Sequence, residues 1–130
     1  MRALAGIVAL ALLAGCSTPG GRKIQQQFEQ LFASPKGQPM LASGLRQYED
    51  GQYAESAKNL QAALDKGLAD KDKVVAYKHL AFIHCSISRE RQCREEFRKA
   101  LAIDPSLELS AAESGHPVWG PIFRSVKAGR

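Results

Sequence analysis

The chain has 130 residues, with 18 lysines and arginines against 13 aspartates and glutamates, and a formal net charge of +5 at pH 7. A chain of this length makes one domain of ordinary size that can bury a modest core. Its charges are interspersed rather than blocked, and no nucleic-acid-binding motif accompanies them. The composition therefore favours acidic partners or anionic lipid and argues against nucleic acid.

The first residues have the pattern of a secretory signal. Arg2 supplies a positive charge, residues 3–14 contain no charged or polar side chain, and the small residues Ala14 and Gly15 close the run. This run is shorter than the about 20 apolar residues that a membrane-spanning helix needs. We therefore expect residues 1–15 to be a signal peptide.

The end of this signal, Leu13-Ala14-Gly15-Cys16, resembles the lipobox of bacterial lipoproteins. The resemblance implies that the thiol of Cys16 receives a diacylglyceryl group and that Cys16 becomes the new N-terminus. Two or more lipid chains anchor a protein stably without spanning the bilayer. An ordinary signal peptide with an accidental cysteine is the alternative. Ser17 is not acidic, which by enterobacterial sorting rules indicates the periplasmic face of the outer membrane.

Residues 16–38 are expected to form a lipid-anchored linker, which is rich in small residues and flexible over residues 17–21. Four apolar residues then recur at helical spacing: Ile24, Phe28, Leu31 and Phe32. They predict a short amphipathic helix. The two prolines within residues 34–39 end this pattern, because proline disfavours helix just before it. The main helical domain is therefore expected over residues 39–130.

Two segments, residues 43–67 and 79–104, repeat each other at an offset of 37 residues. Gly44 aligns with Ala81 (81 − 44 = 37), and Leu60 aligns with Phe97 (97 − 60 = 37). Each segment predicts two antiparallel helices joined by a tight turn. The turns are expected at Asp50-Gly51 and at Ser88-Arg89, and the small residues are expected where two helices approach closely.

The repeated segments resemble the tetratricopeptide repeat, a helical hairpin of about 34 residues. The matching positions are Gly44, Gly51, Tyr53, Leu60 and Ala63 in the first unit and Tyr77, Leu80, Ala81, Phe97, Ala100 and Pro105 in the second. The resemblance covers residues 39–105 and implies an all-α fold, a short array of two hairpins with flanking helices. An unrelated pair of helical hairpins is the alternative.

The sequence departs from the repeat pattern in three respects. Ser56 and Cys93 occupy a position that is usually alanine, and the first unit lacks its closing proline. Three extra residues around 65–73 predict a longer turn between the two units. A two-unit array also needs covered ends. We expect a C-terminal capping helix that starts at Pro117 or at Pro121. Its apolar stripe consists of Trp119, Ile122, Phe123 and Val126.

Cys85 and Cys93 form an even pair once Cys16 is lipidated, and such a pair in an exported chain indicates a disulfide. Each lies four residues from Arg89, so the two thiols are expected to meet in the first layer beyond the turn. Two buried, inert thiols are the alternative. A zinc site that adds His84 lacks the usual ligand spacing.

The chain shows no paired acids, glycine-rich phosphate loop or serine elbow, and His79 and His84 are five residues apart, which places them poorly on one helix face. We therefore expect a protein that is not an enzyme and needs no metal or cofactor. Tetratricopeptide arrays bind partners on a concave face lined by the first helix of each unit. That resemblance implies a partner-binding set, for which packing against the flanking helices is the alternative: Leu45, Tyr48, Lys78 and Phe82, with Trp119 as a further candidate.

The plan of the whole chain, and residues 101–123 in particular, resembles the TssQ family of type VI secretion system-associated lipoproteins. The resemblance implies a non-catalytic, lipid-anchored periplasmic accessory whose partners are envelope proteins of a secretion apparatus. A pilotin-like lipoprotein that assists secretin or pilus assembly is the second reading. An enzyme acting on peptidoglycan or a small ligand is the third.

The lipobox predicts that the Cys16→Ser variant accumulates as unprocessed precursor and loses lipid labelling, because a hydroxyl cannot replace the thiol as the acceptor. Metabolic labelling with a radioactive fatty acid, followed by gel analysis of the precursor and mature forms, measures both effects. Normal maturation and labelling of the variant would rule out the lipid anchor.

Overall fold

The computed structural model describes residues 23, 24, 26–28 and 33–129 and divides the chain after Ala33 into two units. In the first unit, residues 23, 24 and 26–28 are helical, within the segment where an amphipathic helix is expected. Leu31, Phe32, the signal peptide and Cys16 lie outside the described residues. No helix within the described part of the chain has the length and apolar character needed to cross a membrane.

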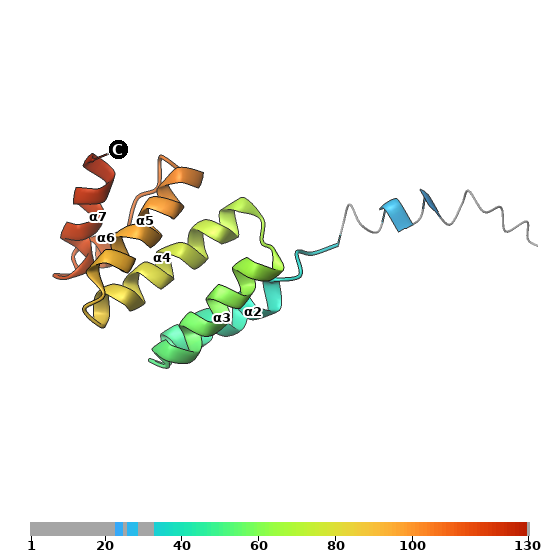
Figure 1. Ribbon diagram of the computed structural model, residues 1–130, viewed down its shortest axis with the longest axis horizontal. Helices are drawn as coiled ribbons and strands as arrows, with labels where there is room; N and C mark the ends of the chain where they lie inside the picture. The colour runs from blue at the N-terminus through green and yellow to red at the C-terminus, as the bar shows by residue number, and fades with distance from the viewer. Residues whose placement is uncertain (1–22, 25, 29–32, 130) are drawn as a thin grey trace, which may run out of the picture. The chain divides into compact units, whose positions relative to one another are not determined.

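The second unit, residues 34–129, consists of helices without a strand among its described residues. The helices in chain order are α2 (Gln38–Glu49), α3 (Tyr53–Lys66), α4 (Asp70–Ser86), α5 (Glu90–Ile103), α6 (Ala111–Ser114) and α7 (Trp119–Ala128) (Figure 1). The pairs α2–α3 and α4–α5 pack as hairpins, α4 also packs on α3, and α7 packs on α5 and α4. The predicted all-α, tetratricopeptide-like array of two hairpins with flanking helices is therefore confirmed.

The two hairpin turns have the same hydrogen bonds at the offset of 37 residues. The amide of Gln52 donates to the carbonyl of Gln47, and the amide of Arg89 donates to that of His84, both at 2.8 Å. The residue before each donor has a left-handed backbone, with φ of 76° at Gly51 and 62° at Ser88. Glycine adopts this conformation freely, whereas another residue pays about 1 kcal/mol. The turns lie at the positions that the repeat predicts.

Within each hairpin the two helices approach at a small residue. A Cβ on Gly44 would lie 2.9 Å from the side chain of Leu60, so the first hairpin has no room for a larger residue there. Ala81 and Phe97 occupy the equivalent positions of the second hairpin, and both are fully buried. Ser56 stands at a position that is usually alanine in the repeat. Its buried hydroxyl donates a hydrogen bond to the carbonyl of Gly44 at 2.7 Å.

Cys93 stands where the first hairpin has Ser56 (93 − 56 = 37), and the structure joins it to Cys85 in a disulfide. The two Cα atoms are 5.2 Å apart, and both side chains are buried beside the second turn. The second hairpin thus has a covalent link between its helices at the position where the first has a hydrogen bond.

The connection between the hairpins differs from the prediction. We expected a lengthened turn around residues 65–73, but only residues 67–69 lie outside helices. Gly67 ends α3 with a φ of 102°, and the extra residues extend the start of α4 instead. Asp70 and Asp72 lie in the first turn of α4, where a negative charge is favourable against the helix dipole.

The compact unit begins at Ser34, ahead of the expected start at residue 39. Gly37 is buried, and its amide donates to the carbonyl of Gly67 at 3.0 Å. A Cβ at Gly37 would lie 2.2 Å from the carbonyl oxygen of Ala63. The backbone before α2 is therefore packed against the end of α3 and belongs to the helical domain.

The C-terminal helix α7 begins at Trp119, between the two predicted starts. Pro117 and Val118 form a turn before it, and Pro121 lies in its first turn. The expected apolar stripe packs inward, since Phe123 and Val126 are buried in the core of the second hairpin and Ile122 packs against it. The helix α6 was not predicted.

Removal of the disulfide in the Cys85→Ala/Cys93→Ala variant is expected to lower stability by about 2.5 kcal/mol, because the unfolded chain regains the freedom of a short loop. For a domain of this size the melting temperature should fall by about 10 °C, measured by circular dichroism without reductant. The difference should largely disappear when both proteins are unfolded and refolded with reductant. Equal melting temperatures without reductant would contradict the prediction.

Candidate partner-binding surface

Phe82 of α4 lies at the centre of a group of aromatic side chains from four helices. Its ring centroid lies 6.4 Å from that of Tyr48 on α2, 6.0 Å from Phe97 on α5 and 4.6 Å from Trp119 on α7. His79, one turn before Phe82 on α4, lies edge-on to Tyr48 at 5.0 Å. Phe82 is only 1% exposed. The first helices of both hairpins and the C-terminal helix therefore meet at one buried ring.

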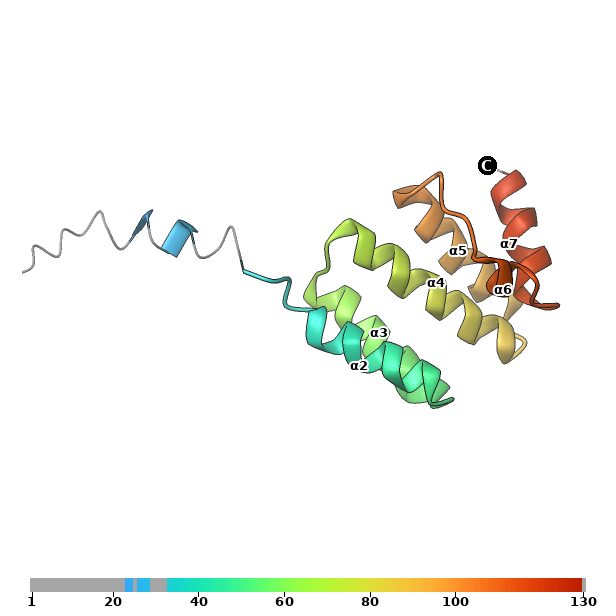
Figure 2. The same ribbon diagram turned by 180° about the vertical axis from the view of Figure 1, so that it is seen from behind.

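Residues 107–118, which we call the closing segment, contact this region from outside. The Nζ atom of Lys78 on α4 lies 2.8 Å from Oε1 of Glu113, and these side chains are 18% and 25% exposed. Trp119 donates from Nε1 to the carbonyl of Glu113 at 2.9 Å, and His116 stacks on the indole of Trp119. In Figure 2, α2, α4 and α6 lie on the side that faces the viewer. The closing segment thus covers part of the face formed by α2 and α4.

The structure brings Tyr48, Lys78, Phe82 and Trp119 of the expected partner-binding set together, but they contact one another. Phe82 is buried under Trp119 in this conformation, and the partner-binding role of the set stays a prediction. Lys78 is already paired with Glu113. Trp119 is half-buried and packs against the core of the second hairpin. Leu45 is half-buried against the core of the first hairpin.

Beside this face lies a pair of tyrosines that we call the tyrosine rim: Tyr48 of α2 and Tyr53 of α3, whose ring centroids are 5.4 Å apart. Tyr53 is 41% exposed and Tyr48 is half-buried. Burial, with smaller contributions from Tyr53 and Glu113, raises the pKa of Tyr48 to about 12. Its hydroxyl therefore remains neutral and able to donate a hydrogen bond at any physiological pH.

Glu113 is the residue of this surface that the sequence reasoning missed. It forms a capping box with Ser110: the Ser110 amide donates to Oε2 of Glu113 at 3.0 Å, and the Glu113 amide donates to Oγ of Ser110 at 3.2 Å. Burial alone would raise the pKa of Glu113, but hydrogen bonds from Lys78 and Ser110 outweigh it and lower the pKa. The serine followed three residues later by glutamate is a recognisable start signal for a helix.

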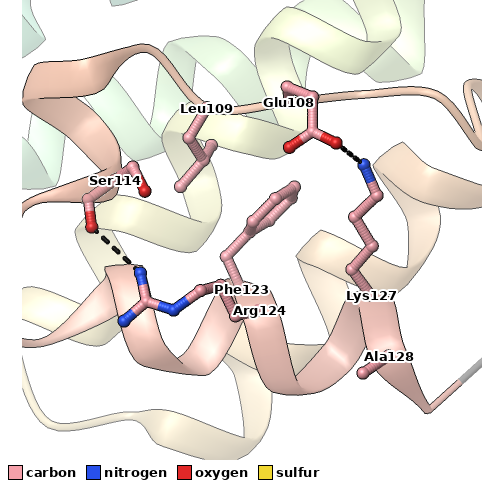
Figure 3. A pocket seen from close by; sticks show the side chains of 7 residues that line it. All are labelled: Glu108, Leu109, Ser114, Phe123, Arg124, Lys127 and Ala128. Carbon is pink, nitrogen blue, oxygen red and sulfur yellow. Dashed lines mark hydrogen bonds and ion pairs between the residues drawn. The ribbon is translucent and has the colours of Figure 1, made fainter.

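A shallow pocket of about 300 Å³ lies between α7 and the closing segment (Figure 3). Leu109 and Phe123 form its apolar floor. Arg124 donates to the backbone carbonyl of Ser114 at 3.2 Å, and Lys127 donates to that of Leu107 at 2.9 Å and pairs with Glu108. These cations hold the closing segment to α7. The lining has one carboxylate and neither histidine nor cysteine.

A second pocket, of about 330 Å³, contains two carboxylates, Asp70 and Asp104. Asp70 pairs with Lys73 at 2.9 Å. Hydrogen bonds from the side chain and amide of Ser106 lower the pKa of Asp104. A general acid near neutral pH needs a raised pKa, so the carboxyl of Asp104 is not arranged for acid catalysis. Within the described part of the chain, no three metal-ligating side chains gather in one place.

The chain is 32% identical over 81 residues to the Photosystem I assembly protein Ycf3 of Synechococcus sp. (strain CC9605). The match covers 61% of this chain and 47% of that protein, so the chain spans about half the length of the curated relative that it matches. No protein-family model and no solved structure matches the chain significantly.

The surroundings of His79 predict how stability depends on pH. Burial lowers the pKa of His79, and the adjacent Lys78 lowers it further, against the opposing effects of the Val75 carbonyl, Glu113 and Glu49. Below about pH 6.5 the unfolded chain therefore binds a proton that the folded chain does not, and stability falls as the pH decreases. Thermal melts between about pH 7.5 and pH 5.5 should show this decrease.

The matched variant His79→Gln keeps a polar side chain that cannot be protonated, so its melting temperature should depend less on pH over the same range. Burial also lowers the pKa of His84, so part of the decrease should remain in the variant. An unchanged pH dependence in His79→Gln would contradict the assignment.

Proposed function

We propose that this chain is a non-catalytic scaffold that assists the assembly of a larger protein complex. The observation that carries the proposal is the two-hairpin array, in a chain that over 81 residues is similar in sequence to a photosystem assembly protein. Helical-hairpin arrays present extended surfaces to partner proteins. The exposed tyrosine rim offers such a surface, since aromatic side chains are enriched where proteins bind each other.

We further propose that the scaffold acts in the periplasm, attached through Cys16 to the outer membrane. The lipobox-like residues 13–16 support the anchor, and Ser17 supports the choice of membrane. The Cys85–Cys93 disulfide supports export, because such bonds form and persist in oxidising compartments.

The proposed setting is a type VI secretion system, whose envelope proteins would be the partners. This part of the proposal rests on the resemblance of residues 101–123 to the TssQ lipoproteins. The closing segment and the first half of α7 lie in that stretch, so the residues most similar to the family include those that cover the α2–α4 face. The alternative is a pilotin-like role in secretin or pilus assembly, which the same anchor and fold would serve.

Crosslinking of intact cells that express a tagged, lipidated chain tests the proposal, with captured proteins identified by mass spectrometry. We expect envelope components of the type VI machine, and their yield should fall at least about fivefold in Tyr53→Glu, because the charge disrupts an apolar contact at the rim. Ile87→Glu is the matched control, since Ile87 is 48% exposed at the second turn and is not one of the two rim residues. Its yield should be unchanged.

Capture of secretin or pilus components instead would favour the pilotin-like role over type VI secretion. An equal loss in Tyr53→Glu and Ile87→Glu, or no capture of any envelope complex, would contradict the scaffold proposal. Circular dichroism of both variants controls for unfolding.

A further inference from the structure

The closing segment packs against the core of the second hairpin through Leu107 and Leu109, whereas its polar contacts with α4 are few. Its short helix α6 buries none of its residues, and among the helices α6 packs only against α7. The contact that reaches across to α4 is the ion pair of Glu113 with Lys78, 35 residues apart in the chain. A carboxylate of the closing segment therefore binds a lysine on the face formed by α2 and α4.

The surroundings of Lys78 form a recognisable site for a carboxylate. Its ammonium lies 5.8 Å from the centre of the Phe82 ring, and the rings of Phe82 and Trp119 stack beside it. Tyr48 adds a third aromatic ring and a neutral hydroxyl. A half-buried lysine needs a negative partner, because an unpaired charge in such surroundings is costly. Glu113 supplies that charge in the closed structure.

We propose that the closing segment is an internal ligand, and that the partner of this face is a protein segment whose carboxylate displaces Glu113 from Lys78. This inference rests on the proposed scaffold function and specifies the chemistry of its partner. Trp119 belongs to α7 and covers Phe82, so the aromatic side chains beside the incoming acid are Trp119 and Tyr48. The partner is thus an acidic segment with an apolar side chain next to its carboxylate.

Displacement also follows from the way the closing segment is built. The two carboxylate oxygens of Glu113 have different partners. Oε2 accepts a hydrogen bond from the Ser110 amide, and Oε1 binds Lys78. A partner that takes Lys78 leaves the capping box of α6 and the contacts of the closing segment with α7 intact, so only the side chain of Glu113 has to leave Lys78. As a tethered ligand it has a high effective concentration, in the millimolar range for short flexible tethers, and excludes weak competitors.

A synthetic peptide with the sequence of residues 107–118 tests the inference on the purified mature chain. The reporter is the indole N–H resonance of Trp119, the single tryptophan of the sequence. The peptide should bind the Glu113→Gln variant at least about tenfold more tightly than the wild type, because the internal competitor is weakened. The same peptide with glutamine in place of its Glu113 should not bind. Lys78→Met in the Glu113→Gln background should abolish binding.

Ser110→Ala is the matched control, since it removes one capping hydrogen bond of α6 and keeps the carboxylate on Lys78. It should increase peptide affinity less than Glu113→Gln does. Four results would each overturn the inference. Two concern affinity: Ser110→Ala increases peptide affinity as much as Glu113→Gln does, or the wild type binds the peptide as tightly as Glu113→Gln. In the other two, the peptide does not bind Glu113→Gln, or it still binds after Lys78→Met. Because no envelope protein takes part, these results do not depend on whether the chain acts in type VI secretion.

Discussion

The burial of Phe82 is the interaction on which the rest of the domain depends. Its ring contacts Tyr48 of the first hairpin, Phe97 of its own hairpin and Trp119 of the C-terminal helix. A two-hairpin array has exposed apolar ends that must be covered. Because the two hairpins and the C-terminal helix all pack around the ring of Phe82, each buries apolar surface of the others. The continuation from Phe97 to Phe123, with centroids 5.2 Å apart, extends the same packing to the inner face of α7.

The two hairpins have the same helix packing, but different bonds join their helices next to the turn. Their turns have matching hydrogen bonds, and their helices meet at Gly44 and at the equivalent Ala81. Next to the turn, the first hairpin uses the hydroxyl of Ser56, and the second uses the Cys85–Cys93 disulfide. The covalent link belongs to the hairpin that carries Phe82 and Lys78, so it braces the helices that support the covered face.

The hairpins and their turns could be predicted from the sequence because they depend on local, repeated signals, namely small residues, a glycine or serine at the turn, and apolar residues at a fixed offset. The cysteine pairing followed from the same symmetry. The closing segment could not be predicted as a cover, because many of its residues are exposed and its contact with Lys78 depends on the path of a long loop. The capping-box pattern of Ser110 and Glu113 could have indicated the start of α6. Nothing in the local sequence indicates that Glu113 reaches α4.

The central claim is that the C-terminal part of the chain covers the face of α2 and α4 through Trp119 and Glu113. Nuclear Overhauser effects measured on the mature chain test it most directly, because they report distances below about 5–6 Å between assigned protons, a range that stacked rings satisfy. The account predicts cross-peaks between the indole of Trp119 and the ring of Phe82, and between the side chains of Glu113 and Lys78. A Phe82 ring with no contact to Trp119, and amides of residues 107–118 that exchange freely with water, would contradict it.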